Sequence, residues 1–509
     1  MVSDNNKRIA KNTFFLYIRM LFTLGVTLYT SRVVLQVLGV EDFGIFNVAG
    51  GVVAMFSFLN YSLAGVTQRF LTFEIGKENW LRLLKVFNIS VSIHLIIAGI
   101  ILLLGETIGL WVVCEKLVIP AHRLPAALWV YHLAIFSAIF SIMNVPYVGV
   151  IIARERMGIF ASISMIDVVF KLVIVYALTL FSFDKLQLYG ILIFVSSAII
   201  FLLYRYVSFR EFEETHIKKL IWDRVLFREI ASFAGWAMNG NLAVVGYTQG
   251  LNVLLNLFFG PATNAARAVA VQVQNAVNGF SSGFQTSLNP QITKNYATGE
   301  LTHMHKLIFT SSKLSFFLLL VISLPLFYET PFVLGLWLGQ VPDGSINFIR
   351  LTLLVGLFST LSNPLIVAIH ATGNIKRFQL WEGSILLLIV PISYFILKFG
   401  YPAESVFVVH LLIALIAQGI RIWIVGHAIA MDRIQYFKKI VLRILVVLPI
   451  CAVCSFGVHC NLPEGFLRVA CVGLTGMLSV VFFLYLFGLD QTEKLVVKSY
   501  MKKLTSRKK

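Results

Sequence analysis

Two arginines, Arg32 and Arg267, stand inside long apolar stretches of this sequence. A charged side chain is costly in such surroundings and usually has a function. A guanidinium group suits phosphate recognition, because its planar fork bonds pairs of oxygen atoms and keeps its charge. The simpler alternative is that each side chain extends to a polar boundary and binds no ligand. Both arginines are therefore candidates for binding an anionic substrate.

A carboxylate and an amine lie four residues apart in another apolar stretch. Asp167 precedes Lys171, and this spacing places both on one helix face in the order that favours an ion pair. The pair either only neutralises itself, or Lys171 attracts a substrate anion while Asp167 binds a coupling cation such as H⁺ or Na⁺. Glu382 is a further acid inside an apolar stretch and a second candidate for ion coupling.

Amide side chains are concentrated between residues 239 and 285, and Asn241, Asn275 and Asn278 belong to this group. So many amides cannot all face lipid. A few would suffice for hydrogen bonds between helices. The group therefore favours a hydrated lining that could bind sugar hydroxyls.

Catalytic signatures are absent from the sequence. It contains no GxxxxGK[ST] or HExxH pattern and no cluster of His, Cys and Asp. Its five cysteines are too few for a disulfide framework. We expect no catalytic residue, no bound metal and no cofactor.

The composition excludes most soluble classes. Hydrophobic residues make up 58% of the 509 positions and charged residues 13%, against about 25% charged in soluble domains. A soluble enzyme, a nucleic-acid-binding protein and a disordered chain do not fit. We expect an all-α polytopic membrane protein, because runs of ~20 apolar residues can each cross a bilayer. Fourteen such runs occur, at 14–38, 43–66, 86–113, 125–152, 159–181, 187–208, 229–258, 263–288, 307–330, 345–369, 378–399, 402–429, 440–458 and 466–487.

The basic residues predict the orientation of these spans. Of the 42 Lys and Arg, 31 lie in or beside the breaks on one side of the predicted membrane and 5 in the breaks on the other. Basic residues mark the cytoplasmic side. We therefore expect a multi-pass protein of the bacterial plasma (inner) membrane with both termini in the cytoplasm.

Two halves of the chain resemble each other. Thr67-Gln68-Arg69 matches Asn289-Pro290-Gln291, and Pro146 and Pro364 lie 218 residues apart in corresponding spans. Such a repeat predicts two pseudo-symmetric lobes of six helices, with the prolines as bends or hinges. The expected parts are a first lobe at 1–208, a cytoplasmic linker at 209–228, a second lobe at 229–429, two added helices at 430–487 and a basic cytoplasmic tail at 488–509.

Several motifs resemble the polysaccharide transporter family. They are Lys7-Arg8-Ile9-Ala10-Lys11-Asn12, Ser31-Arg32-Val33-Val34-Leu35, Leu38-Gly39-Val40-Glu41-Asp42-Phe43-Gly44, Thr67-Gln68-Arg69-Phe70, Gly76-Lys77-Glu78-Asn79 and Leu336-Trp337-Leu338-Gly339. That family belongs to the multidrug/oligosaccharidyl-lipid/polysaccharide (MOP) superfamily, together with the MATE exporters. The resemblance implies a MATE-like fold, in which two six-helix lobes surround a central cavity.

The resemblance and the cationic, amide-rich stretches together predict a flippase. It would move a polyprenyl-pyrophosphate-linked oligosaccharide to the outer leaflet for O-antigen, lipopolysaccharide or other surface polysaccharide biosynthesis. Its partners would be that substrate, membrane lipids, a monovalent cation and polysaccharide assembly proteins, and not nucleic acid. The alternatives are a cation-coupled multidrug exporter of the same fold and a membrane glycosyltransferase or polysaccharide polymerase.

Overall fold

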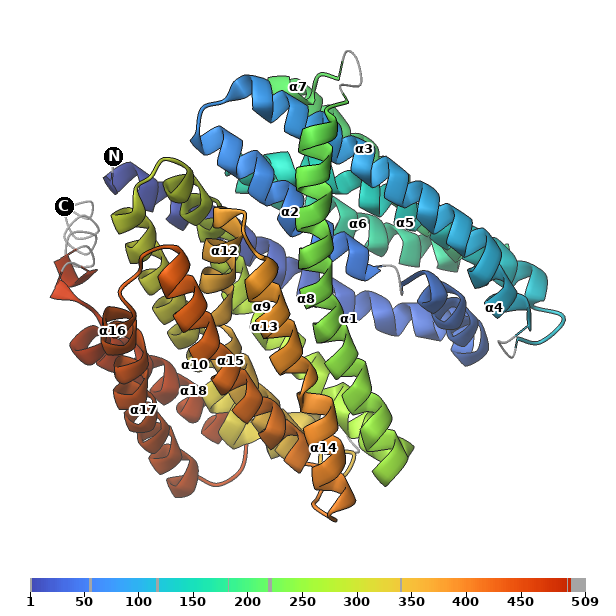
Figure 1. Ribbon diagram of the computed structural model, residues 1–509. Coiled ribbons are helices and arrows are strands. Elements are labelled where there is room, and N and C mark those ends of the chain that lie inside the picture. Colours follow the sequence, from blue (N-terminus) through green and yellow to red (C-terminus); the bar gives the residue numbers. More distant parts are fainter. Residues whose placement is uncertain are drawn as a thin grey trace, which may run out of the picture. The chain divides into compact units, whose positions relative to one another are not determined.

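A computed structural model describes residues 2–54, 57–115, 119–181, 183–217, 222–338, 341–491 and 493–495. Within these ranges the regular elements are all helices (Figure 1). The longer helices are α1 (Val2–Ala54), α2 (Ser57–Gly76), α3 (Trp80–Leu104), α5 (Leu124–Ala153), α6 (Met157–Leu180), α7 (Lys185–Glu211), α8 (Arg224–Phe259), α9 (Pro261–Ala297), α10 (Leu301–Leu338), α15 (Ser405–Ala428), α17 (Leu442–Asn461) and α18 (Phe466–Phe483). The shorter ones are α4 (Leu110–Glu115), α11 (Ser345–Ser359), α12 (Ser362–Thr372), α13 (Lys376–Leu387), α14 (Ile389–Lys398) and α16 (Arg433–Tyr436).

Eleven helical segments of the described chain are long and apolar enough to cross a membrane. The other three expected spans fall on α1, α2 and α9. The span expected at 43–66 covers the end of α1 and the start of α2, and residues 55–56 between them lie outside the described residues. The break expected after residue 38 coincides with Gly39, where the backbone of α1 is not helical.

Left-handed backbone turns recur at the offsets of the sequence repeat. Gly39 (φ 75°) and Gly260 (φ 80°) lie 221 residues apart. Glu78 (φ 55°) and Gly299 (φ 78°) are separated by the same 221 residues. This conformation is uncommon outside glycine, so its recurrence at one offset indicates the same local path of the chain in both halves.

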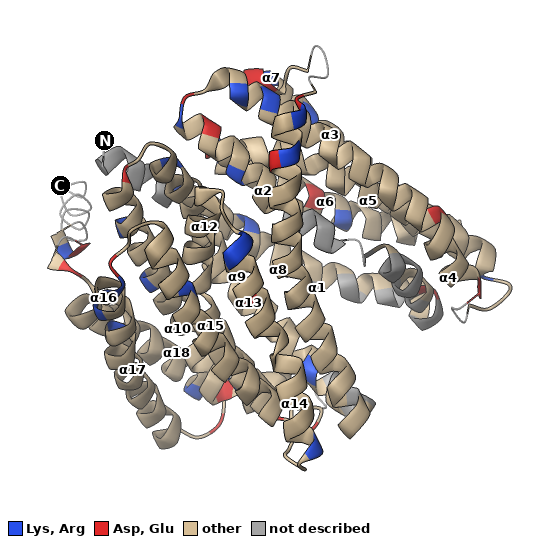
Figure 2. Ribbon diagram, in the orientation of Figure 1, with Lys and Arg blue, Asp and Glu red and all other residues tan. Residues whose placement is uncertain are grey.

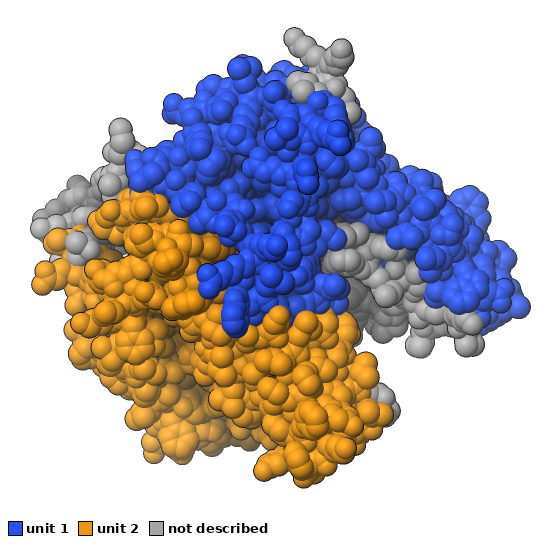
Figure 3. Space-filling model, in the orientation of Figure 1, with its two compact units in different colours: residues 1–245, 286–300, 370–383 blue, residues 246–285, 301–369, 384–509 orange. Residues whose placement is uncertain are grey.

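The chain divides into two compact units, which Figure 3 shows in different colours. Unit 1 comprises residues 1–245, 286–300 and 370–383. Unit 2 comprises residues 246–285, 301–369 and 384–509. Unit 1 therefore includes three segments of the expected second lobe, 229–245, 286–300 and 370–383.

Helix α5 is central to unit 1, where it packs against α1, α2, α3 and α7. In unit 2, α10 packs against α11, α17 and α18. The added helices are tied to α10 by buried charges: Glu329 accepts hydrogen bonds from Arg468 Nε (3.1 Å) and pairs with His459 Nδ1 (2.7 Å). Figure 2 shows most charged residues near helix ends, so a charge within a helix body calls for a reason.

Candidate functional site

Arg267 is a buried cation in unit 2 and is 5% exposed. It lies two turns into α9, after the left-handed turn at Gly260 that joins α8 to α9. Its Nη1 donates to Asn252 Oδ1 and its Nη2 to the carbonyl of Thr248 at 3.0 Å. Its Nε is buried and has no hydrogen-bond partner. Within the described residues no carboxylate forms an ion pair with it, so this cation has neutral acceptors and a spare donor.

Two amides of α9 form hydrogen bonds with the main chain of other segments. Gln274 Nε2 donates to the carbonyl of Thr352 (3.2 Å) and Gln285 Nε2 to that of Thr360 (2.8 Å). These two therefore join α9 to the neighbouring chain segment, as the alternative interpretation expects. Asn275 is exposed, and Asn278 lies close to Gly356 of α11.

Asp167 and Lys171 form the ion pair that their spacing predicts. Lys171 Nζ lies 2.9 Å from Asp167 Oδ2 on α6, and the side chains are 46% and 34% exposed. Both belong to unit 1, as do half-buried Asn241 on α8 and Glu382 on α13. The side chain of Arg32 lies outside the described residues.

The two prolines lie in different backbone settings. Pro146 is inside the continuous helix α5. Pro364 is in the first turn of α12, just after the helix break at Thr360 and Leu361. A proline at 364 cannot donate to the carbonyl of residue 360, and Gln285 supplies that hydrogen bond instead. The proposed hinge at Pro364 thus coincides with an observed break.

Arg69 of α2, which the sequence analysis did not select as a site residue, binds the end of α12. Its Nε donates to the carbonyl of His370 (2.9 Å) and its Nη2 to that of Ala371 (3.0 Å). These carbonyls belong to the last turn of α12, where the i+4 donors of the helix are missing, and the amide of Gly373 also donates to the carbonyl of His370 at 3.1 Å. The next turn needs Gly373, because its φ is 81° and a Cβ there would lie 2.9 Å from Arg69 Nη2.

Glu155 makes the corresponding contact in the other half. It lies in the turn between α5 and α6 with φ 58° and is 4% exposed. Its carboxylate accepts from Lys294 Nζ at 2.6 Å and from Gln291 Nε2 at 2.5 Å, both on α9. Glu155 was not predicted as a site residue from the sequence.

The two contacts are related by the repeat. Gln291 matches Arg69 at an offset of 222, and Gly373 matches Glu155 at an offset of 218. A helix of each half therefore binds a turn of the other half, and all of these residues lie in unit 1. We call them the paired turn contacts. Close packing accompanies them, since a Cβ at Gly76 would lie 3.0 Å from Ala297 Cβ.

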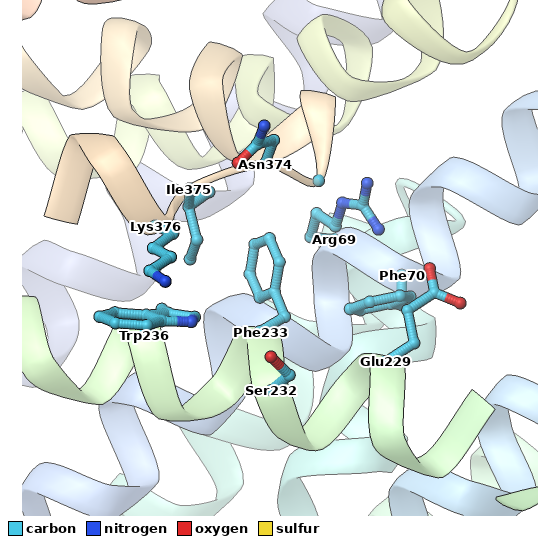
Figure 4. A pocket seen from close by; sticks show the side chains of 10 residues that line it. Arg69, Phe70, Glu229, Ser232, Phe233, Trp236, Asn374, Ile375 and Lys376 are labelled. Carbon is cyan, nitrogen blue, oxygen red and sulfur yellow. The ribbon is translucent and has the colours of Figure 1, made fainter. Parts of the chain in front are cut away.

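A cavity of about 320 Å³ opens beside Arg69. Figure 4 shows Arg69 and Lys376 at opposite ends, with Phe233 between them and Trp236 below Lys376. The Lys376 ammonium lies 5.1 Å from the Trp236 ring centroid. The walls come from α2, α8 and the turn that leads into α13.

A cluster of charges joins α1 to the starts of α5 and α7 in unit 1. Arg123, before α5, donates to Asp42 of α1 (2.8 Å) and to Asp184. Asp184 also caps α7 by accepting from the amide of Gln187 (3.0 Å). Burial opposes ionisation of Asp184, but its hydrogen bonds outweigh this effect and lower the pKa of its carboxyl. The bond to Asp184 raises the pKa of Arg123.

Comparisons with known proteins define the fold. No family model and no curated protein match the chain. A solved MATE in complex with MaD5 has a TM-score of 0.70 at 14% identity, with 84% of this chain and 96% of that chain covered. An outward-facing multidrug resistance MATE family transporter of the MOP superfamily has a TM-score of 0.69 at 16% identity, with 83% and 96% covered. A mutant of a Vibrio cholerae MATE transporter has a TM-score of 0.64 at 17% identity, with 86% and 99% covered.

The chain therefore has the fold of the MATE transporters of the MOP superfamily. Its eleven apolar helices identify it as a multi-pass membrane protein. The three neighbours leave 14–17% of the chain uncovered.

Proposed function

We propose that this protein is a flippase that moves a lipid-linked, diphosphate-bearing oligosaccharide across a bacterial plasma membrane by alternating access. The observation that carries this proposal is Arg267, a buried guanidinium with neutral partners and an unpaired Nε. An uncompensated buried ion is costly, and a substrate diphosphate would supply the missing charge. Asn275 and Asn278 on the same helix would bind glycan hydroxyls.

The other proposed roles follow from the ion pair on α6. Lys171 would bind substrate phosphate when Asp167 exchanges its partner for a coupling cation, and Glu382 is the alternative coupling acid. Arg32 remains a proposed substrate contact. The termini would be cytoplasmic, and polysaccharide assembly proteins would supply or receive the substrate.

The paired turn contacts support alternating access. They join a helix of each half to a turn of the other half through hydrogen bonds and one ion pair. We propose that they close the cytoplasmic side in the conformation described here and separate when the cavity opens inward.

A multidrug exporter is the second candidate, because one structural neighbour is a multidrug resistance transporter. A cationic drug would need an acidic or aromatic site. The first expected span, 14–38, has no Asp or Glu, and the buried charge at Arg267 would repel such a drug. A membrane polymerase is less favoured, since only a short connection separates α10 from α11.

Transport into reconstituted vesicles tests the proposal. Flipping of a polyprenyl-diphosphate oligosaccharide is measured as loss of access to a membrane-impermeant lectin, alongside uptake of a fluorescent cationic drug. We expect Arg267→Gln to lose oligosaccharide flipping and Arg267→Lys to retain part of it, because Lys keeps the charge but not the fork. Normal flipping by Arg267→Gln would refute the proposed role of this residue, and drug uptake without flipping would establish the exporter.

A further inference from the structure

We infer that the cavity beside Arg69 is a binding site for the phosphate group of a lipid at the cytoplasmic surface. This inference concerns a second site, separate from Arg267, and it does not depend on which substrate is transported. The cavity lies wholly within unit 1, between α2, α8 and the start of α13. The cavity is formed by segments far apart in the sequence, so it depends on the tertiary structure.

The charge of the cavity favours an anion. Arg69 and Lys376 provide two cations, and the one acid that lines it, Glu229, bonds Arg82 Nη2 at 3.0 Å. Arg69 is 8% exposed, which limits how far water can screen it. Within the described residues, no carboxylate forms an ion pair with Lys376. A cationic ligand would meet net positive charge here.

The start of α13 adds hydrogen-bond donors. The main-chain N–H groups of the first turn have no acceptor inside the helix, and the helix dipole favours an anion at that end. Residues 374–376, which lead into this turn, line the cavity, and the amide of Asn374 already donates to Thr372 Oγ1 at 3.2 Å. A phosphate between Lys376 and Arg69 could accept from both side chains and from the amides of the first turn of α13.

The other walls favour a lipid over a soluble phosphate. Phe70, Phe233 and Trp236 give the cavity apolar surface, and aromatic rings are typical of the membrane interface. Neighbouring residues near the start of α8 are strongly exposed and apolar, with Trp222 at 54% and Val225 at 79%. Such residues would face lipid beside the entrance. About 320 Å³ also exceeds the volume of one phosphate, which leaves room for a headgroup.

Native mass spectrometry of the full-length protein tests this site. The protein in mixed micelles is titrated with phosphatidylglycerol, and bound lipid is counted after mild activation. We expect one tightly retained lipid on the wild type. Lys376→Gln should weaken it about tenfold, because a charge-assisted hydrogen bond is lost. Ser232→Trp, which fills the cavity from α8, should remove it.

Lys77→Gln is the matched control. The Lys77 ammonium also lies over an aromatic ring, 4.6 Å from Phe73, but Lys77 does not line the cavity. Equal retention by Lys376→Gln and Lys77→Gln would overturn the inference. So would a retained lipid on Ser232→Trp, provided its unfolding temperature without added lipid equals that of the wild type.

Competition with sodium pyrophosphate separates the two sources of phosphate. Displacement of the lipid by pyrophosphate identifies the phosphate group as the determinant. If the protein retains the lipid but does not bind pyrophosphate, the site recognises a lipid headgroup. If it binds pyrophosphate but does not retain the lipid, the site belongs to a soluble phosphate. Binding of neither would refute the site, and the flipping assay with Arg267→Gln would still stand as a separate test.

Discussion

Glu155→Gln should weaken the closed conformation of this protein. Glutamine keeps the size of the side chain but removes the charge that neutralises Lys294, and its NH₂ group must face a donor. Breaking a fully buried ion pair costs about 3–5 kcal/mol. The Lys294 side chain is 21% exposed, so we expect about 2 kcal/mol. If the contact exists only in the closed state, the ratio of open to closed protein rises about 30-fold.

A cysteine at Ala297 reports on this ratio. In a background with the five native cysteines replaced by serine, Ala297→Cys lies against Gly76 of α2. Its reaction with a water-soluble maleimide should follow the open fraction, so Glu155→Gln should raise the labelling rate about 30-fold. Combining Glu155→Gln with Lys294→Gln should give less than the sum of the two effects, because both changes remove one interaction.

Glu300→Gln is the control for local charge. Glu300 is an exposed carboxylate three residues from the label, so its loss changes the thiol environment without breaking a turn contact. If Glu155→Gln and Glu300→Gln label at the same rate, Glu155 does not hold the closed state and the proposed gate is refuted.

Three further predictions concern other parts of the chain. Asp184→Asn should remove an acid-sensitive contribution to stability. Because the pKa of Asp184 is lowered, its bond with Arg123 stabilises the protein above the ordinary pKa of 3.8, and this stabilisation is lost as the pH falls below that value. The melting curves of wild type and variant should therefore converge at low pH. Glu329→Gln should lower stability by about 3 kcal/mol, because it leaves Arg468, with a side chain 13% exposed, without its carboxylate; unfolding in detergent measures this. Lys171→Ala should abolish oligosaccharide flipping while the protein remains inserted and abundant, and normal flipping would reduce the pair on α6 to self-neutralisation.

Much of the helical arrangement could be predicted from apolar length. The run at 125–152 became α5 (Leu124–Ala153), and the run at 187–208 became α7 (Lys185–Glu211). The span expected at 263–288 covers twenty-six residues, whereas the polar helix α9 extends over Pro261–Ala297. The helix is longer because its hydrogen bonds continue after the apolar stretch ends.

The site was predictable only where its contacts are local. The pair on α6 follows from a spacing of four residues. The contacts of Glu155 with Lys294 and of Arg69 with Ala371 span 139 and 302 residues, and no local pattern encodes them. The available signal was the repeat, since both contacts use positions that match between the halves.

Both paired turn contacts have the same direction of hydrogen bonding, although their residues differ. In each, the donors lie on a helix of one half and the acceptors lie at a turn of the other half. One turn supplies the carboxylate of Glu155, whereas the other, with Gly373, supplies main-chain carbonyls. A phosphate in the cavity would offer Arg69 a charged acceptor in place of neutral carbonyls, which adds the attraction of an ion pair to the hydrogen bonds. Binding there would therefore draw Arg69 away from α12, and by linkage an open turn contact would strengthen binding by the same factor.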